Sequence, residues 1–167
     1  SAVFANDNEG TDGADEADEV TVTITEKSGI ETYDGTVKTV TGYDVSIDNN
    51  SYTVNDFTFN GTASVSGTNA GTYSMELKPE DFTNINDNFN VKFEIEDGTL
   101  EITKRQVILT SATDYKDFNG EPLTNDTITV SGDGWAKDEG ATYDVTGSQT
   151  EIGESNNTFT YTLDGNT

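Results

Sequence analysis

The chain has 167 residues, and its 8 lysines and arginines stand against 32 aspartates and glutamates, which gives a formal net charge of −24. This charge repels phosphate backbones and anionic lipid head groups, so we expect neither a nucleic-acid nor a membrane partner. Because the sequence contains no histidine and no cysteine, it lacks the common zinc ligands, thiol nucleophiles and histidine general base. We therefore predict that the chain is not an enzyme, and paired carboxylates are the one common catalytic device left open.

The first 19 residues are predicted to be a signal-peptide remnant followed by a flexible acidic leader. Val3 and Ala5 fit the small-residue pattern of a signal-peptidase site, which predicts a secreted or bacterial cell-surface protein; a cloning remnant is the alternative. Residues 6–19 are acidic and contain no large apolar side chain, which is typical of a flexible segment. Four acidic residues here are a candidate calcium site, but their spacing does not match a calcium-binding loop, and a solvated acidic tail is the favoured interpretation: Asp7, Glu9, Asp12 and Asp15.

From Val20 onward the apolar residues recur at every second position. Val20, Val22 and Ile24 alternate with threonines, as expected of a half-buried strand. The same period returns in four further runs, at residues 52–59, 73–77, 91–95 and 100–102. Clusters of Gly, Asn and Asp separate the runs, and no segment has the period of an amphipathic helix. The pattern predicts an all-β fold, an antiparallel β-sandwich or barrel.

The pair Asp97-Gly98 lies between two alternating runs, in the sequence FEIEDGTLEI. Asp-Gly supplies the positive φ values that a tight two-residue turn requires. We therefore predict a hairpin that closes the first domain.

An internal repeat divides the chain. Tyr33-Asp34-Gly35 returns 85 residues later as Phe118-Asn119-Gly120, and the run 72–77 returns 86 residues later as 158–163. The spacing predicts two tandem domains, over residues 20–104 and 105–167. In the first copy of this turn we expect Gly35 to take a positive φ, Asp34 to cap the turn through its side chain, and Tyr33 to return to the core.

The joint between the domains is short, since residues 102–107 contain no Pro, Gly or Ser run. This favours a semi-rigid connection. The second domain lacks a counterpart of the predicted closing hairpin, which would leave a sheet edge open. We expect the natural chain to continue past Thr167; the alternative is that another segment supplies the missing strands.

Two sequence pieces carry a resemblance to a known family: residues 67–73, GTNAGTY, and residues 98–104, GTLEITK. Together with the turn at Tyr33 they resemble the MBG domains of bacterial surface adhesins. The resemblance implies Ig-like β-sandwiches in a long cell-surface protein, with neighbouring repeats of the same chain as partners. It carries no catalytic signature and names no ligand.

Candidate binding residues lie in two loops. Asp81 and Asp87 in the loop 78–90, and Asp133 and Asp138 in the second loop, are weak calcium candidates, because loop oxygens are the ligands that calcium prefers. The single tryptophan, Trp135, either stacks on a sugar or closes one end of the sandwich. No other cofactor is expected.

The predicted function is that of a non-catalytic repeat region. We expect a semi-rigid spacer or stalk that also serves as an adhesion scaffold. The alternative is a module that binds carbohydrate or a host protein, through Trp135 or an exposed sheet edge. The glycan or protein ligand itself is not identified by the sequence.

Overall fold

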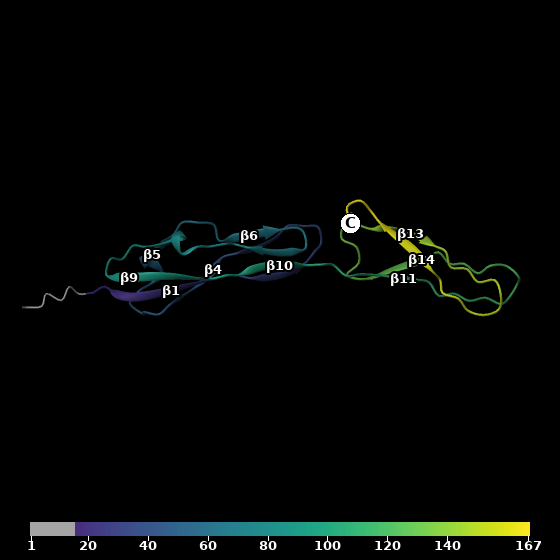
Figure 1. Ribbon diagram of the computed structural model, residues 1–167, viewed down its shortest axis with the longest axis horizontal. Coiled ribbons are helices and arrows are strands. Elements are labelled where there is room, and N and C mark those ends of the chain that lie inside the picture. Colours follow the sequence, from purple (N-terminus) through teal and green to yellow (C-terminus); the bar gives the residue numbers. More distant parts are fainter. Residues whose placement is uncertain (1–15) are drawn as a thin grey trace, which may run out of the picture. The chain divides into compact units, whose positions relative to one another are not determined.

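A computed structural model describes residues 16–167 (Figure 1). The candidate signal remnant and the leader residues Asp7, Glu9, Asp12 and Asp15 lie outside the described residues. The described chain forms two compact units, each assembled from separate segments: unit 1 comprises residues 16–27, 41–64 and 74–98, and unit 2 comprises residues 28–40, 65–73 and 99–167. The predicted division at residues 104 and 105 follows the sequence repeat rather than these units, and it stays a prediction.

Unit 1 is made of five strands and two single turns of 3₁₀-helix. The strands are β1 (Asp18–Glu26), β4 (Tyr43–Ile47), β5 (Phe57–Phe59), β8 (Phe82–Asn84) and β9 (Phe89–Glu96), and the 3₁₀ turns are η1 (Val54–Asp56) and η2 (Pro79–Asp81). β1 lies between β4 and β9 in a three-stranded sheet, and β5 pairs with β8. The segment 78–90, predicted as one long loop, therefore contains a 3₁₀ turn and a strand.

Unit 2 holds nine short strands. They are β2 (Gly29–Thr32), β3 (Lys38–Thr41), β6 (Ser64–Gly67), β7 (Gly71–Ser74), β10 (Thr99–Thr103), β11 (Val107–Ser111), β12 (Ile128–Gly132), β13 (Ala141–Val145) and β14 (Phe159–Leu163). β10 lies between β2 and β7, whereas β3–β6, β11–β12 and β13–β14 form two-stranded ladders. No α-helix occurs in residues 16–167, which confirms the predicted all-β class.

Two strand pairs are parallel, which the sequence pattern did not predict. β1 pairs with β9 in parallel from Asp18↔Phe89 to Thr25↔Glu96, and β10 pairs with β2 in parallel from Leu100↔Gly29 to Thr103↔Thr32. In both sheets each residue faces the one 71 positions further along the chain. The prediction of antiparallel pairing is wrong for these two pairs, because period-two alternation specifies a strand but not the direction of its neighbour.

The predicted hairpin at Asp97-Gly98 is also wrong. β9 and β10 pair with β1 and β2 rather than with each other, and Gly98 is not among the glycines with positive φ. The side chain of Glu26, only 3% exposed, accepts hydrogen bonds from the backbone N–H of Gly98 at 2.8 Å and of Leu77 at 2.9 Å. A Cβ at position 98 would lie 2.6 Å from the carbonyl oxygen of Glu26. Glycine is therefore required here for close backbone approach and not for a left-handed turn.

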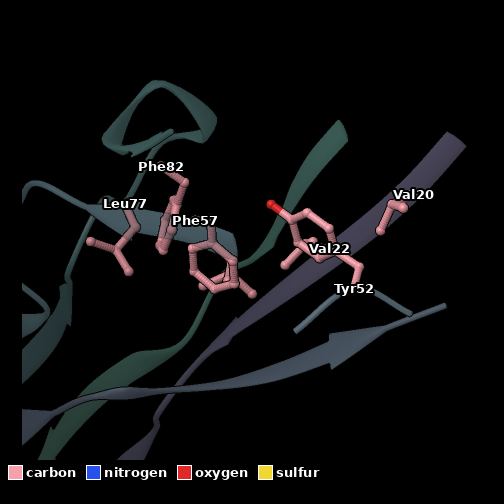
Figure 2. Packing of buried hydrophobic residues seen from close by; sticks show 7 residues of the cluster. Val20, Val22, Tyr52, Phe57, Leu77 and Phe82 are labelled. Carbon is pink, nitrogen blue, oxygen red and sulfur yellow. The ribbon is translucent and has the colours of Figure 1, made fainter. Parts of the chain in front are cut away.

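The core of unit 1 is an aromatic cluster packed on β1. Figure 2 shows Tyr52 beside Val20 and Val22 of β1, and Phe57 next to Phe82 in the same buried cluster. The strand β1 buries every second residue, as its alternation predicted. Several rings meet edge to face, with centroids of neighbouring pairs 5.3–6.0 Å apart. Such packing supplies the apolar burial that a chain of this low apolar content needs.

Burial falls sharply along the second repeat. Among residues 105–167 only Ala136 and Gly140 are buried, whereas Leu100 and Ile102 of β10 are 0% and 2% exposed. The large apolar residues left exposed there include Ile108, Tyr115, Phe118, Ile152 and Tyr161. Residues 105–167 form the strands β11–β14.

Candidate functional site

The calcium candidates of the first loop do not come together. The carboxylate of Asp81 caps η2, because it accepts the backbone N–H of Lys78 at 2.8 Å. Asp87 is exposed and lines a shallow hollow with Glu16 and Asp18. The neighbouring Asn86 is used in a turn, where its side chain donates to Asp56. Each of these groups has a local structural partner or faces solvent.

Asp133 and Asp138, the calcium candidates of the second loop, also have separate structural roles. Asp133 accepts the backbone N–H of Gln106 at 2.9 Å, so its carboxylate ties a loop to the joint between the repeats. Asp138 is exposed and takes a positive φ of 64° in a turn. Within residues 16–167 the structure shows no group of three or more acidic side chains placed to hold a metal ion.

Trp135 lies half-buried in the loop between β12 and β13. Its indole N–H donates a hydrogen bond of 3.1 Å to the hydroxyl of Tyr143 on β13. One part of the ring is thus held against the strand and another part is open to solvent, a geometry in keeping with either predicted role. Binding of sugar by Trp135 stays a prediction.

A polar cluster that the sequence did not indicate surrounds the joint. The guanidinium of Arg105 donates to three backbone carbonyls: to Gly134 at 2.7 Å, to Asp133 at 2.6 Å and to Tyr33 at 3.3 Å. The hydroxyl of Tyr33 donates to the carboxylate of Glu139, and this hydrogen bond raises the pKa of Tyr33. The prediction that Tyr33 returns to the core is wrong, because its side chain is half-exposed and bonds to the second repeat's loop.

The other two residues of the Tyr33 turn, Asp34 and Gly35, behave as the sequence predicts. Gly35 takes a φ of 80°, and Asp34 accepts the backbone N–H of Thr36 at 2.9 Å, as expected of an Asp-Gly turn. A 2.7 Å ion pair with Lys38, together with the bonds from Thr36, holds the pKa of Asp34 well below its usual range. The turn is therefore a structural device that presents Tyr33 to the joint.

A cavity of the described chain lies in the second repeat. It has a volume of about 1010 Å³ and is lined by residues 111–118, 123–125 and 147–157. The side chain of Asn157 bridges its wall, donating to the carbonyl oxygens of Ala112 and Asn125 at 3.0 and 2.9 Å. No sequence motif predicted this cavity.

The described part of the chain contains no helix long and apolar enough to span a membrane. No curated protein and no solved structure matches the sequence. The family model of the MBG domain matches residues 19–104, slightly more than half of the chain. This match confirms the resemblance seen in the GTNAGTY and GTLEITK segments and covers the range that contains the two parallel strand pairs. The chain therefore belongs to the MBG domain family.

Proposed function

We propose that the chain is a non-catalytic repeat region of a secreted or cell-surface bacterial protein, where tandem Ig-like domains act as a semi-rigid spacer and adhesion scaffold. MBG domains usually occur in extracellular surface proteins, and the acidic composition keeps such a chain soluble and its surfaces mutually repellent. The absence of histidine and cysteine from the sequence supports a role without catalysis.

The observation that carries this proposal is the bonding of Arg105. Its planar guanidinium is anchored by three carbonyl oxygens, of Gly134, Asp133 and Tyr33. A further hydrogen bond joins the hydroxyl of Tyr33 to the carboxylate of Glu139. Because hydrogen bonds to a charged donor are stronger than neutral ones, these contacts oppose bending where the first repeat passes into the second.

Small-angle scattering and NMR relaxation of the whole chain test the spacer role. We expect an elongated particle whose repeats tumble together, and an Arg105→Ala variant whose repeats reorient independently. Lys104→Ala is the matched control, because it also removes one positive charge from an exposed residue. Within the described residues the side chain of Lys104 makes no hydrogen bond or ion pair. A compact wild-type particle, or equal effects of the two substitutions, would contradict the proposal.

The strand order also suits a chain that bears tension. β1 begins the matched segment and β10 ends it, and each lies in a parallel pair, β1 with β9 and β2 with β10. Opposite pulls at the two ends load the hydrogen bonds of a parallel pair together instead of opening them one at a time. We expect residues 19–104 to resist a pull through the chain ends better than β13–β14, an antiparallel ladder of adjacent strands, in single-molecule force measurements.

A further inference from the structure

The outer edge of the strand β9 is open along most of its length. β9 pairs with β1 on one side, and no strand of residues 16–167 pairs with its other side. Only the start of this edge is covered. The side chain of Asn84 donates to the carbonyl oxygen of Phe89 at 3.1 Å, and the N–H of Phe89 donates to the carbonyl oxygen of Asn86 at 3.2 Å. The backbone groups of Phe89 therefore point away from β1.

The rest of the edge follows from this direction. Backbone N–H and C=O groups alternate in direction along a strand, so those of Val91, Phe93 and Ile95 also point away from β1. Within the described chain these groups have no hydrogen-bond partner on that side. An edge with unpaired backbone groups is a template for the addition of another strand.

The two faces of β9 differ in character. Val91, Phe93 and Ile95 are partly buried and pack against the core cluster of unit 1. Lys92 and Glu94 are exposed on the other face, where they form an ion pair of 2.6 Å. A strand that extends this sheet therefore needs apolar residues on one face and complementary charges on the other. β9 itself has that pattern.

A second copy of β9 fits this edge in an antiparallel register centred on Phe93. Phe93 of one copy then lies opposite Phe93 of the other, and Val91 lies opposite Ile95 on the same apolar face. On the polar face Lys92 of each copy lies opposite Glu94 of the other. The two lysines and two glutamates thus alternate in sign around a square, which stabilises the pairing.

The neighbouring registers are less favourable. A centre at Lys92 or at Glu94 brings that residue opposite its own equivalent, and a centre at Ile95 brings Glu94 opposite Glu96. Each of these registers places like charges directly across the ladder, which is destabilising. A centre at Val91 leaves both charges opposite asparagines. The charge pattern therefore favours one occupant, a second copy of this strand, in one register.

We propose that β9 is a homophilic interaction surface, through which two copies of this chain pair edge to edge and antiparallel about Phe93. Main-chain hydrogen bonds of Val91, Phe93 and Ile95 hold the two strands together, and the pairs between Lys92 and Glu94 fix the register. The net charge of −24 on each chain opposes the contact, so the dimer is weak. The proposal does not depend on the spacer role, since β9 lies within unit 1.

Sedimentation equilibrium of the full chain tests the proposal at physiological ionic strength, where the screening length is about 8 Å. We expect a monomer–dimer equilibrium with a dissociation constant below about 1 mM. Lys92→Glu and Glu94→Lys each turn two attractive pairs into two repulsive ones and should weaken the dimer by about tenfold or more. Both side chains are exposed, so the fold should persist. Mixing the two variants restores opposite charges across the ladder and should give a heterodimer close to the wild type in affinity.

Lys104→Glu is the matched control, because it makes the same change in net charge as Lys92→Glu at an exposed residue outside β9. Hydrogen exchange adds a second readout: the amides of Val91, Phe93 and Ile95 should gain protection as the chain concentration rises, whereas the amide of Lys92, which points toward β1, should not.

Four results would overturn the proposal. They are a chain that stays monomeric up to about 1 mM, a mixture of the two charge variants that does not restore the dimer, equal effects of Lys92→Glu and Lys104→Glu, and protection of the three outward amides that does not depend on concentration. The last result would mean that the chain covers this edge with a segment of its own.

Discussion

Replacing Glu26 with alanine is expected to destabilise unit 1 more than any exposed substitution in the chain. Glu26 is 3% exposed, and its two carboxylate oxygens accept the backbone N–H groups of Leu77 and Gly98 at 2.9 and 2.8 Å. The residue joins three segments at the point where β1 ends and β9 passes toward β10. Alanine provides no acceptor and leaves both N–H groups unsatisfied in the interior.

The magnitude follows from those two N–H groups. A buried donor left without a partner costs about 1–3 kcal/mol, so Glu26→Ala should lower the free energy of unfolding by about 2–6 kcal/mol. Glutamine keeps one acceptor oxygen but presents an NH₂ donor to the second N–H group, so Glu26→Gln should cost roughly half as much. The order of stability is therefore wild type, then glutamine, then alanine.

Urea unfolding followed by near-ultraviolet circular dichroism measures this effect, because the aromatic cluster of unit 1 supplies the signal. Glu101→Ala is the matched control: Glu101 is exposed on β10, so its loss should change stability by less than about 0.5 kcal/mol. The reasoning is refuted if Glu26→Ala unfolds within about 1 kcal/mol of the wild type, or if it matches Glu101→Ala.

Three further predictions follow from single contacts. Gly98→Ala should lower the melting temperature strongly, because the new Cβ would lie 2.6 Å from a backbone carbonyl oxygen, whereas Gly165→Ala, with no neighbour within 4 Å, should not change it. Because the pKa of Asp34 is lowered in the folded state, the ionised carboxylate stabilises the fold fully above the unfolded-state pKa of about 4, and this stabilisation is lost as the pH falls through the folded-state pKa. Asp34→Asn should therefore flatten the acid side of the pH–stability curve. An unchanged curve would contradict the assigned ion pair. If Trp135 binds sugar, its fluorescence should shift on addition of polysaccharide and Trp135→Ala should abolish binding; no shift with a panel of glycans would argue against that role.

The turn at Tyr33 shows where local and tertiary information separate. Asp34 and Gly35 behave as their residue types predict, because an Asx turn and a positive φ depend only on neighbouring backbone. Tyr33 does not behave as predicted, because its hydroxyl donates a hydrogen bond to the carboxylate of Glu139, 106 residues further along the chain. No local pattern encodes that distance.

The calcium candidates make a related point. Aspartates and asparagines gather in loops both as metal ligands and as turn residues, and composition does not distinguish the two uses. The structure shows the second use at Asp81, which caps η2, and at Asp133, which binds the backbone of Gln106. Only the three-dimensional directions of the carboxylates separate these roles.

By itself, the sequence determined the all-β class, the alternation that buries one face of β1, the repeat and the family. These features depend on the period of apolar side chains and on local turn chemistry, both of which involve residues close together in the sequence. Tertiary structure alone decided that β9 and β10 pair in parallel with β1 and β2, that Gly98 lies against the carbonyl of Glu26, and that Tyr33 bonds to Glu139. Strand partners are chosen by contacts across some 71 residues, and a period-two pattern fits either direction of pairing equally well.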